Sequence, residues 1–204
     1  MNIVCLGSSA GGLKSLKEFF TCMSADSGQA FVVIQHLMSE GPSLTQEILS
    51  RITSMKVLTA RNQMEVLPNH VYTIPPGVQL TISGGHLMVA PRTESSGRHH
   101  PFDRFLKSLA LDKSTEAIAV VFSGYDGDGA EGFLAIKDRG GRTYAQDATA
   151  TIGEMPASAI ATGSVDFILD VRKIAEHLSH PTPTRDASPL PTVIQSKNSV
   201  GTTP

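Results

Sequence analysis

Residues 2–12 read Asn-Ile-Val-Cys-Leu-Gly-Ser-Ser-Ala-Gly-Gly, an apolar run that passes into a cluster of small residues. The apolar part, Asn2–Leu6, predicts a buried strand, and the small residues Gly7–Gly12 predict a tight turn. Beyond the turn, apolar residues recur at helical spacing, at Leu13, Leu16, Phe19, Phe20 and Met23. A buried strand that leads through a tight turn into a helix is the first unit of an α/β fold.

The rest of the chain repeats this alternation of short apolar runs with amphipathic stretches. Further strands are expected over Ala30–Gln35, Lys56–Ala60, Ala117–Phe122, Thr143–Gln146 and Val165–Leu169. Helices are expected over Ser43–Ile52, Phe102–Leu111, Ala130–Arg139 and Ala157–Ala161, with a last helix from Val171. Because strands separated by helices pair in parallel, we expect a doubly wound α/β fold, a mostly parallel sheet with helices on both faces.

The middle of the chain departs from this alternation. Three extended runs, Val71–Ile74, Gln79–Ile82 and His86–Val89, follow one another with turn residues between them and no helix. Such a pattern predicts an inserted antiparallel hairpin or meander.

Composition and charge narrow the functional classes. The chain has 204 residues, of which 40% are hydrophobic and 18% charged, with a formal net charge of −2. The absence of a basic block argues against nucleic-acid binding, and the apolar runs fall far short of the ~20 residues of a membrane span. The N-terminus has no signal-peptide pattern, and the two cysteines, Cys5 and Cys22, exclude a disulfide scaffold. We therefore expect a cytoplasmic protein with no membrane insertion.

The sequence divides near residue 178. Residues 1–178 carry the periodic apolar pattern of an ordered domain, whereas 179–204 are rich in Pro, Ser and Thr and have no such pattern. We expect this second part to be a linker or a disordered tail, of the kind that often connects to a further domain.

The first loop that offers chemistry follows the first strand. Gly7, Ser9 and Gly11 match the G-x-S-x-G pattern of a nucleophile elbow, in the strand–turn–helix context that the pattern requires. The small neighbours permit a sharp turn that presents the Ser9 hydroxyl, and the helix start offers N–H groups to an oxyanion. A glycine-rich phosphate loop or a plain turn is the alternative, although the Walker A and G-x-G-x-x-G patterns are absent. On this loop alone, nucleophile and plain turn stay equally open.

His36 follows the second strand, which is expected to neighbour the first. Ligands of open α/β sheets bind beyond the carboxyl ends of the strands, so His36 is suitably placed to act as the base that activates Ser9. A lone histidine is more often structural, but the other histidines are less well placed. His99 and His100, for example, fall in a loop whose position the sequence does not define. His36 is the preferred base.

The third loop, Ser123–Gly129, follows the most hydrophobic strand and carries Asp126 and Asp128. One aspartate is expected to cap the following helix, and an aspartate of this loop is also expected to orient the histidine. Because the spacing does not complete a calcium-binding loop, we expect no metal and no cofactor. Serine, histidine and aspartate, each after a strand, indicate a serine hydrolase site whose order, Ser…His…Asp, differs from that of α/β-hydrolases.

With these three loops, the sequence resembles a known family, the catalytic domain of the chemotaxis receptor-glutamate methylesterases (CheB-type). The segments that carry the resemblance are Leu6–Leu13, Val33–Leu37, Val71–Gly77, Arg98–Pro101, Ser123–Gly132 and Gly153–Pro156. They occur in the family's order and cover about residues 1–178, which the resemblance thus identifies as a methylesterase catalytic domain.

The resemblance implies a serine carboxylic-ester hydrolase that cleaves γ-glutamyl methyl esters on the cytoplasmic helices of bacterial chemoreceptors, releasing methanol. Members of the family often deamidate receptor glutamines as well. Carried over residue by residue, Ser9 is the nucleophile, His36 the base and Asp128 the orienting acid. Many members have Gly where this chain has Asp126, which favours Asp128.

Two departures from the family pattern bear on regulation and substrate. Ala10 stands where many members have Thr, and the sequence begins at the first catalytic strand, without the N-terminal receiver domain that standard members carry. The Ser-Ala-Gly-Gly form and the Pro/Ser/Thr tail are more similar to hybrids that place such a domain ahead of a receptor methyltransferase domain. In those hybrids the substrate need not be a chemotaxis receptor, and other signalling proteins with methyl-accepting glutamates are the alternative.

Three other functions stay open from the residues alone. The same triad would serve an esterase or amidase with a different substrate. A docking module of the same fold, non-catalytic or activated by a partner, would bind receptors or a kinase. A nucleotide-binding module is disfavoured because no acidic residue follows the second strand.

Overall fold

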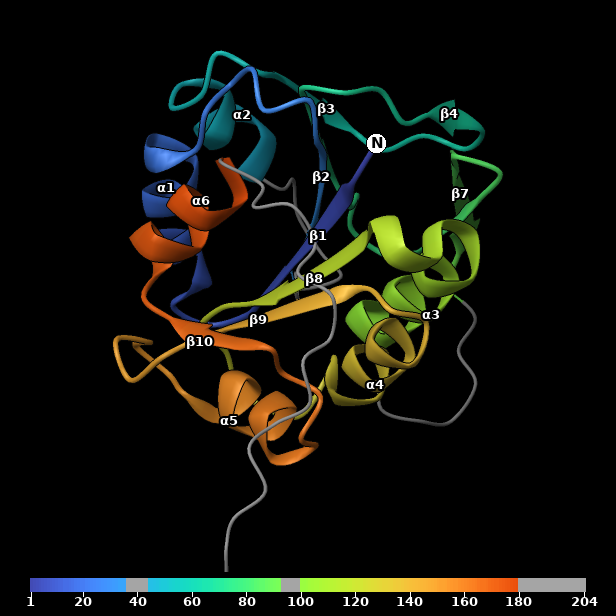
Figure 1. Ribbon diagram of the computed structural model, residues 1–204. Coiled ribbons are helices and arrows are strands. Elements are labelled where there is room, and N and C mark those ends of the chain that lie inside the picture. The colour runs from blue at the N-terminus through green and yellow to red at the C-terminus, as the bar shows by residue number, and fades with distance from the viewer. Residues whose placement is uncertain (36–43, 93–99, 180–204) are drawn as a thin grey trace, which may run out of the picture.

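The computed structural model describes residues 1–35, 44–92 and 100–179 of the chain (Figure 1). Its main sheet has the strand order β10-β9-β8-β1-β2-β5-β3, and every neighbouring pair is parallel. The strands are β1 (Ile3–Ser8), β2 (Ala30–Gln35), β3 (Lys56–Thr59), β5 (His70–Thr73), β8 (Ala117–Val121), β9 (Arg142–Gln146) and β10 (Phe167–Leu169).

A second, antiparallel sheet has the order β4-β7-β6 and consists of β4 (Met64–Glu65), β6 (Val78–Ser83) and β7 (His86–Pro91). The helices are α1 (Gly12–Cys22), α2 (Thr45–Ser50), α3 (Pro101–Lys113), α4 (Ala130–Asp138), α5 (Glu154–Ala161) and α6 (Val171–Ser179), and a 3₁₀ turn spans Ser114–Glu116. This architecture confirms the predicted doubly wound α/β fold with an antiparallel insertion.

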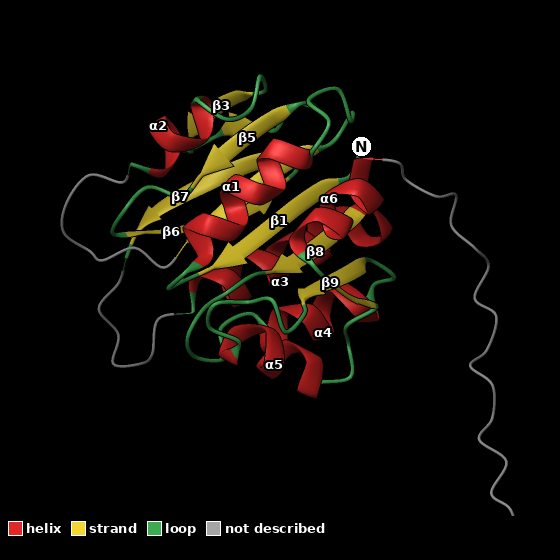
Figure 2. Ribbon diagram, turned by 90° about the vertical axis from the view of Figure 1, so that its left-hand side faces the viewer, coloured by secondary structure: helices red, strands yellow, loops and turns green. Residues whose placement is uncertain are grey.

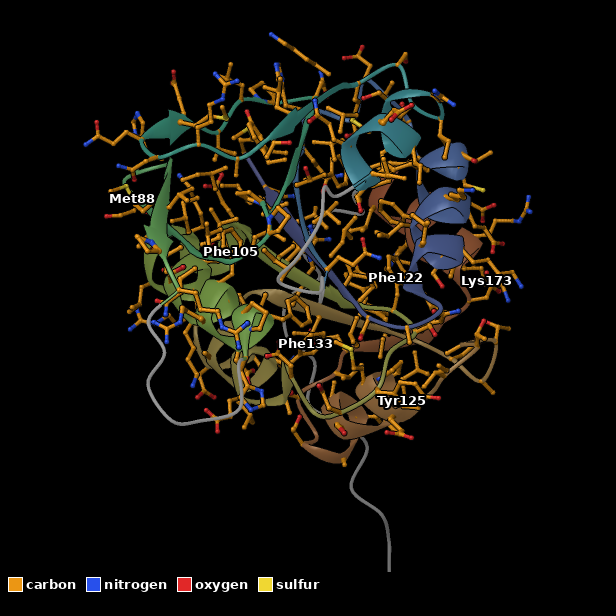
Figure 3. The ribbon with its side chains drawn as sticks, turned by 180° about the vertical axis from the view of Figure 1, so that it is seen from behind. Met88, Phe105, Phe122, Tyr125, Phe133 and Lys173 are labelled. Atoms are coloured by element: carbon orange, nitrogen blue, oxygen red, sulfur yellow. The ribbon has the colours of Figure 1, made fainter. Side chains whose placement is uncertain are left out.

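Two apolar cores lie on opposite faces of the main sheet, because successive side chains of a buried strand point to opposite faces. In β1, Leu6 faces the core under α1, α2 and α6, whereas Cys5 faces the core shared with α3, α4, α5 and the antiparallel sheet. Phe122 belongs to the first core and Phe133 to the second (Figure 3). The strands are therefore hydrophobic on both faces, as a sheet between two helical layers requires.

The structure confirms the expected hairpin for two of its three runs, which form β6 and β7, and corrects the assignment of the first run. The first of its three runs is β5, which pairs in parallel with β2 and β3 in the main sheet, and the antiparallel partner of β7 at its other edge is the short β4. Val71 and Tyr72 are buried in opposite cores, which is the pattern of an interior parallel strand rather than of a half-exposed hairpin. The two residues of β4 are too few to produce a periodic signal.

Two helix boundaries also differ from the expectation. Helix α5 begins at Glu154, three residues earlier than predicted, and includes Pro156 in its first turn. Proline is tolerated there because the first N–H groups of a helix have no intrahelical acceptor. Helix α2 covers only Thr45–Ser50 within the described residues, shorter than the predicted 43–52. The predicted tail covers 179–204: its first residue, Ser179, is the last residue of α6, and 180–204 lie outside the described residues.

The topology creates a switch point at β1. From β1 the chain crosses to β2 through α1, which lies in front of the sheet in Figure 2, and β8 later pairs on the other side of β1. Ligands of such sheets bind beyond the carboxyl ends of the strands at this reversal. Ser9 directly follows β1, and the loop Phe122–Gly129 follows β8. Both elements thus bring candidate side chains to the same edge.

Gly7 in β1 has no space for a side chain. A Cβ built on Gly7 would lie 2.1 Å from Cε1 of Phe102, a ring that is fully buried. We expect Gly7→Ala to lower the free energy of unfolding by about 3 kcal/mol or more, because the ring has no space to retreat. Urea denaturation measures the change. Gly153→Ala is the control, since a Cβ there meets nothing within 4 Å; equal losses for both variants would contradict the account.

Candidate active site

The elbow at Ser9 has the geometry that its small residues predict. The N–H of Gly12 donates to the carbonyl oxygen of Ser9 at 3.0 Å, which closes a four-residue turn. Gly11 within that turn has φ +78° and ψ −14°, a left-handed conformation that favours glycine. A Cβ on Gly12 would lie 2.3 Å from Cβ of Ser8, so glycine is required there as well.

The two adjacent serines occupy different environments. Ser8 ends β1 with no exposed surface, and its hydroxyl has no hydrogen-bond partner among the described residues. Ser9 is half-buried, so its side chain lies at the surface of the sheet edge. Of the two hydroxyls, only that of Ser9 is placed to meet a substrate.

The loop after β8 packs directly against the nucleophile candidate. The N–H of Ser9 donates to the carbonyl oxygen of Ser123 at 3.0 Å. A Cβ on Gly124 would lie 2.9 Å from Cβ of Ser9 and 2.1 Å from Sδ of Met155. Gly124 also donates its N–H to the carbonyl of Ile152 and accepts the N–H of Met155, both at 3.0 Å. The sequence pattern alone does not indicate this contact, which needs a glycine at position 124.

Asp128 is buried and held by the first turn of α3. Its Oδ2 accepts the N–H of Phe102 and its Oδ1 the N–H of Asp103, both at 2.9 Å. The expectation that an aspartate of this loop caps the following helix is therefore not met in that form. Gly129, with φ +105°, is the N-cap residue of α4, and Asp128 instead binds the N-terminus of the preceding helix α3. The positive end of that helix stabilises a buried carboxylate.

Asp126 shapes the same loop. It has φ +69°, a left-handed conformation that is uncommon for a residue other than glycine, and its Oδ1 accepts the N–H of Asp128 at 2.9 Å. A short side-chain bond of this kind stabilises the turn that precedes Asp128. The two aspartates are thus different in kind: Asp126 forms the loop, and Asp128 is the buried carboxylate that the loop positions.

His36 lies outside the described residues, so its role stays a prediction. The residue before it, Gln35, ends β2 and is the register partner of Ser8 in β1. Ser9 and His36 are therefore the residues that follow Ser8 and Gln35, which lie opposite each other on two adjacent parallel strands. The adjacency of the two strands, which the sequence predicted, is confirmed.

His100, which the sequence does not favour as the base, is a neighbour of Asp128. It is the N-cap residue of α3, and its Nδ1 lies 3.5 Å from Oδ1 of Asp128 and 3.9 Å from Oδ2 of Asp103. That Nδ1 is buried without a hydrogen-bond partner among the described residues. Pro101, a favoured residue at the start of a helix, marks the boundary in the sequence, but only the fold brings this boundary to Asp128.

The same three residues form the one group of donor atoms, among those described, that has metal-like spacing. Ligand atoms of His100, Asp103 and Asp128 lie within 4.8 Å of one another. Both oxygens of Asp128 and Oδ1 of Asp103 already accept backbone N–H groups, from Phe102, Asp103 and Gly132. These backbone bonds hold the two carboxylates in place, and the arrangement does not need an ion.

Asp103 has an unusual titration because of its environment. Burial raises the pKa of its carboxyl group, the N–H of Gly132 at 2.7 Å opposes that rise, and the charge of Asp128 adds to it. Because the folded-state pKa is raised, the folded state binds this proton more tightly than the unfolded state. Its stabilising contribution is present at low pH and is lost as pH rises through the folded pKa.

We expect Asp103→Asn to be more stable than the wild type at neutral pH, and to differ little from it near about pH 3, below the ordinary Asp pKa. The amide oxygen can keep the bond from Gly132, while the buried charge is removed. Denaturant unfolding across this pH range measures the difference. Asp138→Asn, which removes an exposed carboxylate, is the control. If the stability of wild type rose relative to that of Asp103→Asn with increasing pH, the predicted direction of the effect would be wrong.

The described residues contain no helix that is both long enough and apolar enough to cross a membrane.

The sequence profile of the CheB methylesterase family matches residues 4–178. The protein-glutamate methylesterase/protein-glutamine glutaminase of Bordetella pertussis is 33% identical over 185 residues, which cover 86% of this chain and 52% of that protein. The chain thus spans about half the length of the Bordetella relatives it matches.

Two further comparisons extend this likeness. An uncharacterized 104.1 kDa protein from Rhodobacter capsulatus is 39% identical over 128 residues, or 62% of this chain and 13% of that protein. The crystal structure of the Thermotoga maritima CheB methylesterase catalytic domain matches with a TM-score of 0.77 and 29% identity, over 87% of this chain and 97% of that one. With the profile, the relatives and the fold in agreement, the chain belongs to the CheB methylesterase family.

Proposed function

We propose that this chain hydrolyses γ-glutamyl methyl esters on the cytoplasmic helices of chemoreceptors or related signalling proteins, and deamidates glutamines at equivalent positions. The proposal is supported most by one arrangement: a half-buried Ser9 on the tight turn after β1, and a buried Asp128 in the loop that follows the adjacent strand β8. The relatives named protein-glutamate methylesterase/protein-glutamine glutaminase support the choice of substrate.

In the proposed mechanism, Ser9 Oγ attacks the ester carbonyl while His36 accepts its proton. His36 then gives that proton to the departing methoxide, and methanol leaves an acyl-enzyme on Ser9. A water molecule, deprotonated by His36, attacks the acyl carbon. The bond from that carbon to Ser9 Oγ then breaks, His36 returns its proton to Ser9 Oγ, and the glutamate product leaves and ionises to its carboxylate. Asp128 orients His36 and stabilises its protonated form. The net reaction consumes one water and yields one methanol; with a glutamine substrate it yields ammonia.

The oxyanion of each tetrahedral intermediate needs donors near Ser9. The N–H groups of Ser9 and Gly12 are already bonded, to the carbonyls of Ser123 and Ser9. The N–H groups of Ala10 and Gly11 have no acceptor among the described residues. Ala10 directly follows the nucleophile, and the residue in that position usually supplies one of the oxyanion donors. We therefore assign these two N–H groups to the oxyanion.

We further propose that the domain acts in the cytoplasm within a longer chain, which in the hybrid form would include a methyltransferase domain. The Rhodobacter relative, matched over only 13% of its length, is consistent with such an arrangement.

Methanol release from methylated chemoreceptor cytoplasmic fragments tests this function, with ammonia release from glutamine-containing fragments as the second arm. We expect wild type to release methanol and His36→Gln to lose at least about 100-fold in kcat, because general-base catalysis contributes that much. Fragments whose methylation sites are replaced by Ala are the control. No release by folded wild type from several receptors would favour a docking module instead.

A further inference from the structure

The turn at the elbow contains a peptide group whose orientation the turn itself does not fix. Ser9 and Gly12 form its hydrogen-bonded ends, and the Ala10–Gly11 peptide is its middle unit. The φ +78° and ψ −14° of Gly11 are the values of the third residue of a type II turn. Glycine populates positive and negative φ with similar ease. The middle peptide could therefore rotate to the type I orientation unless a contact outside the turn holds it.

That contact comes from Ser123. Its Oγ donates to the carbonyl oxygen of Ala10 at 2.9 Å and accepts the N–H of Ile152 at 2.9 Å. In a trans peptide the C=O and the following N–H point in opposite directions. A carbonyl of Ala10 bonded to Ser123 thus directs the N–H of Gly11 away from Ser123. A rotated middle peptide would lose this bond and reverse the N–H.

Ser123 is itself firmly held, as such a contact requires. It is fully buried, its N–H donates to Oε1 of Gln146 at 3.1 Å, and its carbonyl accepts the N–H of Ser9. Gln146, at the end of β9, also accepts the hydroxyl of Ser15 in α1 at 3.0 Å. A buried and fully bonded polar network of this kind rigidifies its members. The elbow, the loop at Ile152 and the end of β9 therefore meet at Ser123, and Gln146 links them to α1.

We propose that Ser123 is a positioning residue that locks the Ala10–Gly11 peptide in the orientation that presents the Gly11 N–H to the oxyanion. This inference rests on the proposed function, in which that N–H is an oxyanion donor. The lock acts before substrate binds, so the donor needs no reorganisation during the reaction, which is the condition under which oxyanion donors are most effective. Ser123 itself does not touch the substrate.

Ser123→Ala removes the lock and leaves the backbone bonds of residue 123 in place. We expect the rate at which a small fluorophosphonate modifies Ser9 to fall roughly 10- to 100-fold, since the lost donor is one of two. In the methanol assay kcat is expected to fall while KM stays the same. Ser108→Ala is the matched control, because Ser108 Oγ also donates to a carbonyl, that of Phe105, and accepts an N–H, that of Ile82.

A crystal structure of Ser123→Ala supplies a readout independent of activity. We expect the Ala10 carbonyl to be rotated or to occupy two orientations. An unmoved carbonyl, or a modification rate equal to that of Ser108→Ala, overturns the inference. If the fluorophosphonate does not modify Ser9 in wild type, the proposed function fails instead, and the carbonyl orientation alone then decides whether Ser123 holds this peptide.

Discussion

Ser9→Ala is expected to reduce methanol release by at least about 10⁴-fold in kcat, because removal of the nucleophile from a serine hydrolase leaves only binding and oxyanion stabilisation. The change removes one oxygen from a half-buried side chain. We therefore expect the free energy of unfolding to stay within about 0.5 kcal/mol of wild type, as for other mild surface changes. Initial rates with methylated receptor fragments and a thermal melt measure the two effects.

The neighbouring serine provides a matched control. Ser8→Ala makes the same chemical change one residue earlier, at a fully buried hydroxyl with no hydrogen-bond partner among the described residues. Loss of a hydroxyl that makes no bond costs no hydrogen bond. Ser8→Ala should retain both stability and activity. Equal activity in Ser9→Ala and wild type would rule out Ser9 as the nucleophile.

Asp128→Asn is expected to have two large effects. Activity should fall about 10⁴-fold in kcat, since an amide cannot stabilise the protonated base and favours the wrong tautomer. Stability should fall by about 2 kcal/mol or more, because the two carboxylate oxygens accept the N–H groups of Phe102 and Asp103 and an amide has only one acceptor oxygen. Single-turnover kinetics and urea denaturation of the purified variant separate the two.

Asp126→Asn is the control for that prediction. Asparagine keeps an oxygen that can accept the N–H of Asp128 and is tolerated at the left-handed φ of position 126. The variant should stay within about tenfold of wild-type kcat, the loss expected for one modest hydrogen bond of about 1 kcal/mol. If Asp126→Asn proved as inactive as Asp128→Asn, the division of roles between these residues would be wrong.

The fold could be predicted largely from apolar patterning. Continuous apolar runs such as 117–122 can only be satisfied by burial on both faces, and the helical repeat after Gly12 fixes the connection. The pairing of β5 was missed because Val71-Tyr72-Thr73 is too short to distinguish a parallel strand from a hairpin strand. Its assignment depends on what packs against each face, which a local pattern does not contain.

The placement of Ser9 and Asp128 was predictable where local sequence and sheet topology coincide, while the catalytic roles of the site residues stay predictions. Ser9 and Asp128 follow strands that are adjacent in space, and the rule that parallel strands end at one edge brings their loops together. The contributions of His100 and Ser123 could not be inferred in this way. His100 reaches Asp128 only because α3 starts beside the β8 loop, and Ser123 acts through a hydroxyl–carbonyl bond across 113 positions of the chain.

Peptide mass spectrometry after reaction with a fluorophosphonate tests the central claim most directly, because the probe modifies only an activated serine. We expect one adduct, on the peptide that contains Ser9, formed quickly in wild type, slowly in His36→Gln and Asp128→Asn, and not at all in Ser9→Ala. An adduct on a different residue, or equal modification of Ser9→Ala, would contradict the account.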